Sequence, residues 1–302
     1  MKSKAVGWFS SESRYHQTRV SIESYHEYHD DYDTKYYLLF TGTIRELSRL
    51  SIPPYVTVVF PNQMNPWYVQ NMHAIGINGG FLRTLLCDYM LQQKHERIMV
   101  FDGDTEFFGS LDDLWGRLED FCDAIVTPHR TIPPPMDGNQ FDQLTMVLWG
   151  NYNAGYVGFA NKPKAREFIN WWMVMSMLHQ EIDPKNGFVA EQGWLRFICD
   201  YLDNVLVLRD MGVNFAYWRY DRDDMLEMKN CRWHVDGTPL RMFHFCRFDP
   251  ENLLASMETH QSRAKCSPLM LDFLAQYRDK IQSSSNISQS ISDTSFSDGT
   301  SV

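Results

Sequence analysis

Two aspartates separated by one glycine, Asp102-Gly103-Asp104, have the residue types and the spacing of a metal site. They follow an apolar run, residues 98–101, which is typical of a buried strand in a parallel sheet. Ligands of open α/β sheets bind just beyond the carboxyl ends of such strands. Paired carboxylates repel each other unless a cation lies between them, and oxygen ligands select a hard ion such as Mn²⁺ or Mg²⁺. The triplet therefore predicts a site for a divalent ion and the phosphates of a ligand.

The position of this triplet distinguishes it from two others of the same form. Asp31 and Asp33 lie in a polar, tyrosine-rich connection, and Asp221 and Asp223 lie in a cluster of charged residues. Both are interpreted as solvated surface, because neither follows an apolar run. The middle triplet alone has the context of a strand end, and we place the metal there.

The elements that must position these aspartates alternate between strand-like and helix-like stretches. Strands are expected at residues 5–9, 35–40, 55–60, 98–101, 122–126, 152–159, 204–208 and 241–246, and helices at 18–29, 43–50, 81–91, 163–179, 189–198 and 269–281. This order predicts an α/β fold with a mostly parallel, Rossmann-like sheet flanked by helices. We expect one domain over residues 1–282 and a disordered Ser-rich tail over residues 283–302.

Composition limits the classes of function. The net charge of −10 argues against nucleic acid or an anionic membrane surface as the main partner. Six cysteines are scattered without C-x-x-C spacing and read as free thiols, and neither a signal peptide nor a membrane-spanning run is present, so we expect a cytoplasmic protein. The loop after the first strand lacks the glycines of dinucleotide and P-loop motifs. The aromatic share of 14% leaves room for stacking on sugars, although most aromatic residues are expected in the core.

Four motifs in order along residues 5–250 resemble glycosyltransferases of the GT-A fold, most closely the family 8 type and related bacterial sugar transferases. They are the Asp-x-Asp triplet after a strand, the strand entry Asn153-Ala-Gly155, the pair Glu191-Gln192, and the late strand that carries His244. Each motif is weak by itself, and the ordered set is fairly specific.

The resemblance implies a role for each matched residue. Asp102, Asp104 and His244 would bind the divalent metal, usually Mn²⁺. The nucleotide-sugar donor would be held by Ser10, Tyr15, Arg83, Asp102, Gly103, Asp104 and Arg247, and Asn153, Glu191 and Gln192 would surround the transferred sugar as catalytic residues. The implied reaction moves a sugar from a nucleotide-diphosphate sugar, UDP-linked by analogy, to a glycan or other hydroxyl acceptor, and we expect retention at the anomeric carbon.

Two departures from the family pattern affect the donor site. The glycine and lysine that usually follow the histidine are absent, so Arg247 is expected to supply the positive charge toward phosphate. The acid before the glutamine is Glu191 where aspartate is usual, and its side chain is one methylene longer. These differences leave the identity of the donor open.

Other functions remain possible for the same residues. A haloacid dehalogenase-type phosphohydrolase also places Asp-x-Asp after a strand, but it requires Gly-Thr next, where this chain has Thr105-Glu106. A nucleotidyltransferase would have a Gly-rich loop after the first strand. A non-catalytic glycan- or nucleotide-sugar-binding protein stays as the alternative to an enzyme. Each residue also has a structural interpretation: His244 in the core, Arg83 in a surface ion pair, Asn153 as a turn residue and Glu191 at a helix start.

Overall fold

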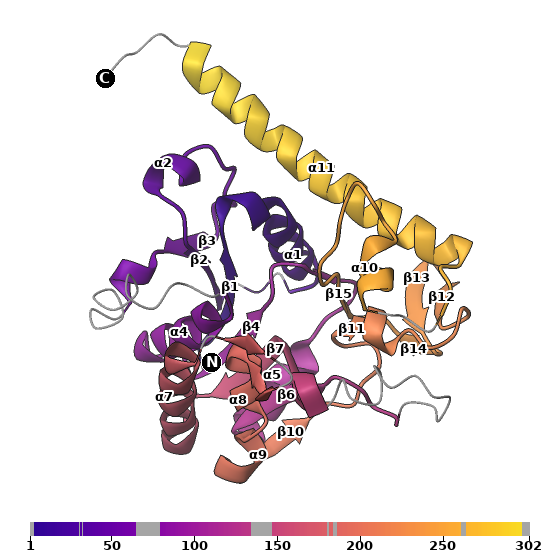
Figure 1. Cartoon of the computed structure of the whole chain (residues 1–302). Coiled ribbons are helices and arrows are strands. Elements are labelled where there is room, and N and C mark those ends of the chain that lie inside the picture. The colour runs from indigo at the N-terminus through magenta and orange to yellow at the C-terminus, as the bar shows by residue number, and fades with distance from the viewer. Residues whose placement is uncertain are drawn as a thin grey trace.

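A computed structural model of the chain describes residues 3–29, 31, 33–64, 79–133, 147–179, 181–183, 186–260 and 264–297. Its main element is a seven-stranded sheet in the order β10-β6-β7-β4-β1-β2-β3 (Figure 1). The strands are β1 (Lys4–Ser10), β2 (Thr34–Phe40), β3 (Val56–Val59), β4 (Arg97–Phe101), β6 (Ala124–Pro128), β7 (Tyr152–Ala160) and β10 (Val205–Val207). Strand β7 is antiparallel to its neighbours β4 and β6, and the remaining pairs are parallel. The sheet is therefore mostly parallel, as the sequence predicts.

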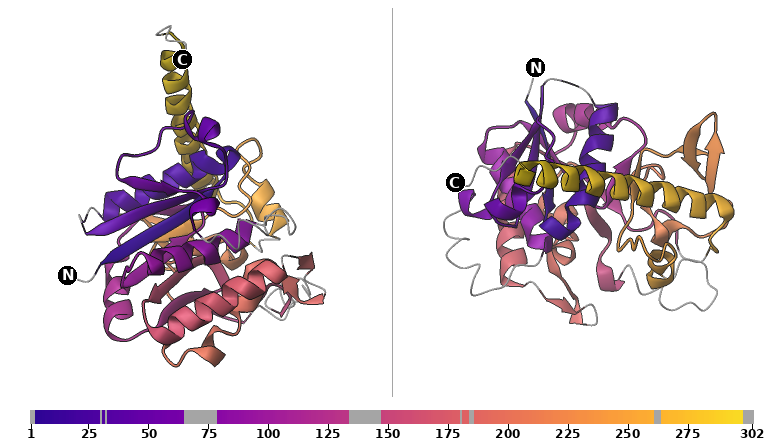
Figure 2. Two further views of the ribbon diagram at one scale, coloured as in Figure 1. Left: turned by 90° about the vertical axis from the view of Figure 1, so that its left-hand side faces the viewer. Right: turned by 90° about the horizontal axis from the view of Figure 1, so that it is seen from above.

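Helices cover both faces of this sheet, because successive residues of a strand point to opposite faces. In β4, Ile98 and Val100 face one hydrophobic core, whereas Met99 and Phe101 face another. The first core is closed by α4 (Gly79–Gln92), α7 (Pro163–Leu178), α8 (Ala190–Leu195) and α9 (Ile198–Tyr201), and the second by α1 (Tyr15–Tyr28) and α5 (Asp112–Asp120). Figure 2 shows helices on both sides of the sheet.

A second layer of short elements lies beside the end of β4. Strand β15 (Met242–His244) pairs with β5 (Thr105–Phe107) and β11 (Phe215–Ala216). A separate antiparallel sheet contains β12 (Leu226–Lys229), β13 (Arg232–Val235) and β14 (Thr238–Pro239), and β8 (Ile182–Asp183) pairs with β9 (Phe188–Val189). A third hydrophobic core lies between these elements, α10 (Ala255–Thr259) and α11 (Pro268–Ser297). The short helix α2 (Ile44–Leu47) and 3₁₀ turns at Glu12–Arg14, Pro61–Gln63 and Tyr217–Arg219 complete the described elements.

The expected strands and helices are present, with three differences. The helix expected at residues 189–198 is divided into the two short helices α8 and α9. The late strand was expected in the main sheet order but belongs to the small β11-β15-β5 sheet. The terminal helix, expected at 269–281, continues as α11 to Ser297, and its Ser284 and Ser288 side chains are buried. The first part of the Ser-rich segment therefore extends this helix, which lies along α1 (Figure 1). Among the described residues, no helix has both the length and the apolar character that crossing a bilayer would require.

Candidate functional site

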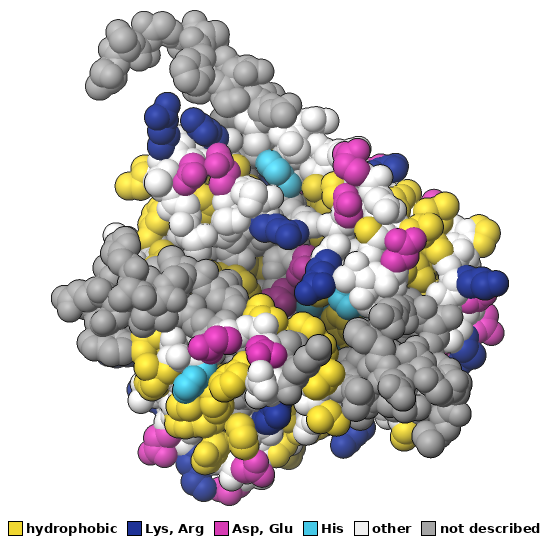
Figure 3. All heavy atoms as spheres, viewed as in Figure 1, with side chains coloured by type: hydrophobic (Ala, Val, Ile, Leu, Met, Phe, Trp, Pro, Cys, Tyr) yellow, Lys and Arg dark blue, Asp and Glu magenta, His cyan; other side chains and the backbone are white. Residues whose placement is uncertain are grey.

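The predicted site residues lie around a cleft at the carboxyl end of β4. Two cavities, of about 400 and 490 Å³, share Arg83, Asp102, Asp104, Glu191 and Gln192 in their walls. Figure 3 shows the opening as a hollow with acidic side chains at its base and basic side chains at its rim. One cavity extends toward β1 and α1, and the other toward β11 and α10. The acidic triplet thus lies where two binding spaces meet.

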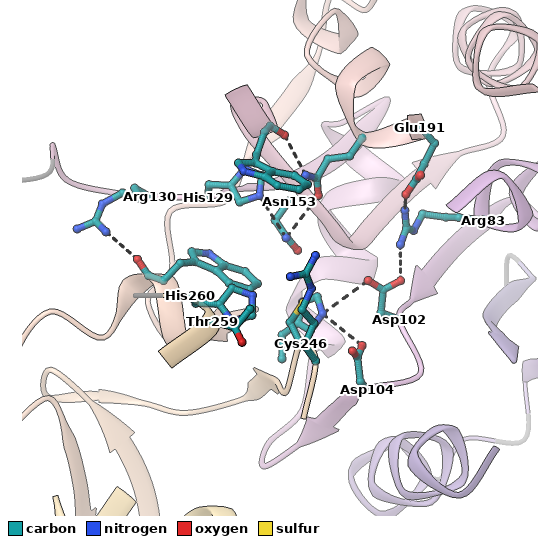
Figure 4. A pocket seen from close by; sticks show the side chains of 15 residues that line it. Arg83, Asp102, Asp104, His129, Arg130, Asn153, Glu191, Cys246, Thr259 and His260 are labelled. Atoms are coloured by element: carbon teal, nitrogen blue, oxygen red, sulfur yellow. Dashed lines mark hydrogen bonds and ion pairs between the residues drawn. The ribbon is translucent and has the colours of Figure 1, made fainter. Parts of the chain in front are cut away.

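Strand pairing brings His244 to the aspartates, although about 140 residues separate them in sequence. Asp104 is followed directly by β5, and β15 pairs with β5 so that His244 lies opposite Thr105. The next backbone amide, that of Phe245, donates to the carbonyl of Asp104 at 2.7 Å. As a result, His244 Nε2 lies 3.3 Å from Asp104 Oδ1 and 3.7 Å from Asp102 Oδ2 (Figure 4).

Two glycines make room for this arrangement. A β-carbon at Gly103 would collide with the hydroxyl group of Thr18 on α1. A β-carbon at Gly155 would collide with the imidazole ring of His244 and would lie 2.7 Å from Asn153 Oδ1. The glycine of each predicted motif is thus required by close packing at the site, and not by a left-handed backbone conformation.

The orientation of His244 is fixed by a buried asparagine, Asn214. The amide group of Asn214 donates to Thr127 Oγ1 at 2.7 Å and to Asn153 Oδ1 at 2.9 Å, so its Oδ1 is left to accept. That oxygen lies 3.1 Å from His244 Nδ1, which therefore carries a proton. The second ring nitrogen, Nε2, then faces the carboxylates, and an outer partner on Nδ1 is the usual support of a histidine that ligates a metal.

The charges at this point are strongly coupled. Burial is the largest single influence and favours the neutral imidazole, but the charge and hydrogen bond of Asp104, together with Cys246, outweigh it, so the pKa of His244 lies well above its ordinary value. Burial is also the largest influence on Asp104 and raises its pKa, but the charge and hydrogen bond of His244, a backbone hydrogen bond and the charge of Arg14 together hold the pKa below the ordinary value. The site therefore attracts positive charge, whether a proton on His244 or a metal ion.

Arg83 connects two predicted site residues. Its guanidinium forms ion pairs with Asp102 through Nη2 and with Glu191 through Nη1, and it lies over the ring of Phe9 with 5.3 Å to the ring centre. Burial alone would lower the pKa of Arg83, but the two carboxylates raise it above its ordinary value. Arg83 is therefore held in the wall of the cleft, not in a surface ion pair, and its engaged nitrogens orient Asp102 and Glu191.

Asn153 and Gln192 form a polar network beside Asp102. Asn153 Oδ1 accepts from the amide of Gly155 at 2.9 Å, and Gln192 Oε1 accepts from the amide of Ala154 at 3.1 Å. Gln192 Nε2 donates to the carbonyl of Trp149 at 2.9 Å. Because β7 is paired with β4, the amide of Asp102 donates to the carbonyl of Gly155 at 3.0 Å. The strand entry and the acidic triplet are thus adjacent in the sheet.

The loop after β1 contributes some of the predicted donor residues to the cleft. Ser10 lines the larger cavity with Arg14 and Thr18, and its hydroxyl accepts from Thr18 Oγ1 at 3.0 Å. Tyr15 does not reach the cleft. Its ring is fully buried in the core, and its hydroxyl donates to the carbonyl of Ser51 at 2.7 Å. The expectation that Tyr15 contacts the nucleotide is therefore corrected, because the side chain of this first residue of α1 packs in the second hydrophobic core.

Arg247 and Cys246 follow β15 in a turn whose Arg247 has a φ of 56°. Both side chains line both cavities, and Arg247 is exposed. Arg247 therefore presents a guanidinium to the junction of the two cavities, in agreement with the charge expected there.

Several residues of the smaller cavity were not predicted from sequence. They are His129, Arg130, Trp149, Trp218, Thr259 and His260. Arg130 is held by Asp221 at 2.5 Å and by the carbonyl of Trp218 at 2.7 Å. Asp221 is therefore a partly buried ion-pair partner and not solvated surface, whereas Asp223 of the same triplet is exposed as expected. In the sequence, the cluster of aromatic residues at 214–218 indicated a wall of this kind, but no pattern singled out an individual residue.

The donor atoms at the triplet fit a divalent ion. Ligand atoms of Asp104, His244 and Cys246 all lie within 4.8 Å of one another, and Asp102 Oδ2 faces the same histidine nitrogen. Carboxylate oxygens and an imidazole nitrogen are ordinary ligands for Mn²⁺ and Zn²⁺. The residues present could thus hold the ion that the sequence resemblance implies.

Comparisons with known proteins agree with this architecture. No protein-family model matches the chain. The uncharacterised protein YfnF of Bacillus subtilis (strain 168) is 23% identical over 167 residues, which make up 55% of this chain and 54% of that protein. The match therefore spans about half the length of this relative.

Solved structures match over more of the chain. The galactosyltransferase LgtC, in complex with donor and acceptor sugar analogues, is 14% identical with a TM-score of 0.55, over 85% of this chain and 94% of its own. The glycosyltransferase GlyE of Streptococcus pneumoniae TIGR4 is 13% identical with a TM-score of 0.55, over 96% of this chain and 64% of its own. The bifunctional glycosyltransferase WbbM is 13% identical with a TM-score of 0.53, over 87% of this chain and 52% of its own.

This chain has the GT-A fold. At these identities the likeness concerns the fold, and the activity must be argued from the site.

Proposed function

We propose that this protein is a metal-dependent glycosyltransferase that moves a sugar from a nucleoside-diphosphate sugar, in the first place a UDP-sugar, to a hydroxyl group of a carbohydrate or another acceptor. The observation that carries this proposal is the convergence of Asp102, Asp104 and His244 at the junction of two cavities. A donor diphosphate at that junction would have its nucleoside in one cavity and its sugar toward the other.

The chemistry of the larger cavity suits the nucleotide. Its wall contains the hydroxyl groups of Ser10, Ser11, Thr18 and Thr41, which can accept from ribose hydroxyls or base N–H groups, and the guanidinium of Arg14. The net charge of the chain is −10, so positive side chains in the wall of this cavity mark the place where an anion would be held. Arg14 and Arg247 are the cations that we assign to the diphosphate.

The leaving group of sugar transfer is the nucleoside diphosphate, whose negative charge increases as the glycosidic bond breaks. A bound divalent ion supplies Lewis-acid stabilisation of that charge. Arg247 adds a fixed positive charge, and Arg83 keeps Asp102 oriented toward the site through its ion pair. The same ion pair system keeps Glu191 ordered beside the sugar, where its carboxylate can stabilise the positive charge of an oxocarbenium-like transition state.

The smaller cavity suits a carbohydrate acceptor. Trp149, Trp218, His129 and His260 line it, and ring faces of this kind pack against the apolar faces of sugars. Gln192 and Asn153 lie at its inner end, next to the metal site. We propose that they contact the transferred sugar and that the reaction proceeds with retention.

A panel of nucleotide-sugars tests the proposal directly. We expect a UDP-sugar to bind in the presence of Mn²⁺ and to release UDP slowly, and we expect chelation to abolish both signals. Asp104→Asn should lower turnover at least about 100-fold. The matched control is Asp33→Asn, which changes an exposed aspartate of another Asp-x-Asp triplet and should leave turnover unchanged.

The alternatives give different results in the same assays. Phosphate release from simple phosphoesters, without any donor turnover, would identify a phosphohydrolase. Tight binding of a sugar nucleotide or a glycan without turnover toward any acceptor would identify a binding protein. If no donor binds with or without Mn²⁺, the proposed function is wrong.

A further inference from the structure

Cys246 is part of the predicted metal site although no sequence pattern marked it. It lies two residues after His244, in the turn that follows β15. Cys246 is half-buried and lines both cavities, as Asp102 and Asp104 do. By contrast, Cys87 is fully buried in the hydrophobic core, where a thiol acts as a small apolar side chain.

The distances at this point fit a shared ion. Ligand atoms of Asp104, His244 and Cys246 lie within 4.8 Å of one another. Two atoms that bind one tetrahedral ion, sulfur at about 2.3 Å and nitrogen or oxygen at about 2.1 Å, are about 3.5 Å apart. A small rotation of the side chains therefore brings all three atoms to bonding distance of the same ion.

The other site residues add to these ligands. Asp102 Oδ1 is occupied by the ion pair with Arg83, and Asp102 Oδ2 lies 3.7 Å from His244 Nε2. Asp104, His244 and Cys246 supply one oxygen, one nitrogen and one sulfur, and Asp102 Oδ2 faces the same histidine nitrogen. Sulfur, imidazole nitrogen and carboxylate oxygen are the ligand types of zinc sites.

We propose that Cys246 binds the metal ion through its sulfur and that the site consequently selects borderline-soft ions such as Zn²⁺ and Co²⁺ over Mg²⁺. As the bond between Sγ and the ion forms, the thiol proton passes to solvent, so binding releases a proton. Thiolate ligands favour softer ions, whereas carboxylates alone suit Mg²⁺ and Mn²⁺. The inference rests on the metal site of the proposed function, but not on the identity of its donor or acceptor.

Cobalt binding tests the sulfur ligand without any measurement of activity. The purified full chain, kept reduced with a phosphine, is titrated with Co²⁺ while its absorption spectrum is recorded. We expect the near-ultraviolet charge-transfer band of a sulfur–cobalt bond together with the visible bands of bound cobalt. Cys246→Ser should lose the charge-transfer band and keep the visible bands. The matched control is Cys231→Ser, at an exposed cysteine in the turn between β12 and β13, which should keep both.

Competition between ions gives a second measurement. In equilibrium dialysis, Cys246→Ser should weaken the binding of Zn²⁺ by about tenfold or more and leave that of Mg²⁺ nearly unchanged, because the lost ligand is the soft one. Equal losses for both ions would indicate that Cys246 acts only through folding or packing and would overturn the inference.

The outcomes separate this inference from the proposed function. Visible cobalt bands without a charge-transfer band in the unmodified chain would overturn the sulfur ligand and leave the Asp and His site intact. Failure of Co²⁺, Zn²⁺ and Mn²⁺ to bind at all would overturn both. Because the spectrum of the unmodified chain decides these cases, a variant that fails to fold does not affect the result.

Discussion

Asn214 joins the two sides of the cleft that we propose for the metal ion and for the sugar. Its side chain is fully buried and bonds to His244, Asn153 and Thr127 at once, and its φ of 53° lies in the left-handed region that asparagine tolerates better than most residues. Asn214 is not among the residues that line the two cavities, whereas His244 and Asn153 line the smaller one, so Asn214 acts by positioning these two neighbours.

Replacement of Asn214 by alanine should therefore weaken the binding of the metal ion more than the binding of the nucleotide. We expect Asn214→Ala to lower the affinity for the ion by about 10- to 100-fold, which is the usual effect of losing an outer partner of a ligating histidine. Isothermal titration with Mn²⁺ measures this loss, and circular dichroism checks the fold. An unchanged metal affinity in a folded variant would show that Asn214 does not orient His244.

His129 is expected to make the stability of the protein depend on pH. Burial, with a smaller contribution from Arg219, lowers its pKa from 6.5 to about 4. Because the folded pKa is the lower one, the neutral imidazole stabilises the fold above pH 6.5, and this contribution is lost as the pH falls toward 4. We expect His129 to account for about 3 kcal/mol of the loss of unfolding free energy over this interval.

Denaturant unfolding at pH 7 and near pH 4 measures this contribution. In His129→Gln the acid-induced loss should be smaller than in the unmodified protein by that amount, whatever the stability of the variant at pH 7. Parallel pH profiles for the two proteins would contradict the expectation.

At the scale of elements, the packing of strand β7 against the end of β15 decides whether the site can form. A methyl group at Gly155 would collide with the imidazole of His244 and crowd Asn153. We expect Gly155→Ala to displace the histidine and reduce Mn²⁺ affinity at least about tenfold. The control is Gly116→Ala on α5, where a methyl group meets nothing within 4 Å, and where alanine should stabilise the helix by about 0.5–1 kcal/mol. If both variants bind Mn²⁺ normally, the packing argument is wrong.

Helices and strands with a clear apolar pattern can be predicted from the sequence, whereas strands of two or three residues cannot. Strand β4 follows from a continuous apolar run bounded by charged residues, and helix α7 from apolar residues at helical spacing. Strands β5, β11 and β14 have two or three residues each, and their stability comes from pairing with distant strands, which no local pattern reveals.

The same distinction applies to the site. Asp102 and Asp104 could be predicted because they directly follow a buried strand, and Arg83 because it lies on the preceding helix in a matched position. Tyr15 was placed by its neighbourhood in sequence, but the first turn of α1 rotates its ring into the core. Cys246, Asn214 and the wall around Trp218 depend on β15 and β11 reaching the end of β4, and this placement is a property of the tertiary structure.

At the scale of the whole molecule, the terminal helix α11 supports the side of the cleft that α1 provides. Helix α11 lies along α1, where Ser284 Oγ is 3.4 Å from His16 Nδ1 and Ser288 Oγ accepts from the amide of Ser51 at 3.3 Å. The same helix α1 carries Thr18, which packs on Gly103. A domain boundary at residue 282 remains a prediction, and the buried Ser284 and Ser288 indicate that shortening the chain there would remove part of this support.

The ion pair between Lys280 of α11 and Glu106 of β5 makes this support dependent on charge. The side chain of Glu106 is 2% exposed and that of Lys280 is 52% exposed, so the acid is the buried partner. Burial raises the pKa of Glu106, and Lys280 partly offsets this. Without Lys280, a buried carboxylate would lack its counter-charge, and Lys280→Met should cost roughly 1–3 kcal/mol of unfolding free energy at pH 7.

The pH dependence of Lys280→Met distinguishes loss of charge from loss of packing. Glu106 has a raised folded pKa, so its neutral form is favoured in the folded protein and the cost of the variant should decrease as the pH falls through that pKa toward 4.5. Denaturant unfolding at pH 7 and pH 4.5 measures both values, and Arg278→Met, which removes an exposed pair with Asp279 on the same helix, should change stability by no more than about 0.5 kcal/mol at either pH. A loss of the same size at both pH values would show that Lys280 acts through its apolar stem. A loss confined to neutral pH would show that the charge of Lys280 holds α11 against the β11-β15-β5 sheet.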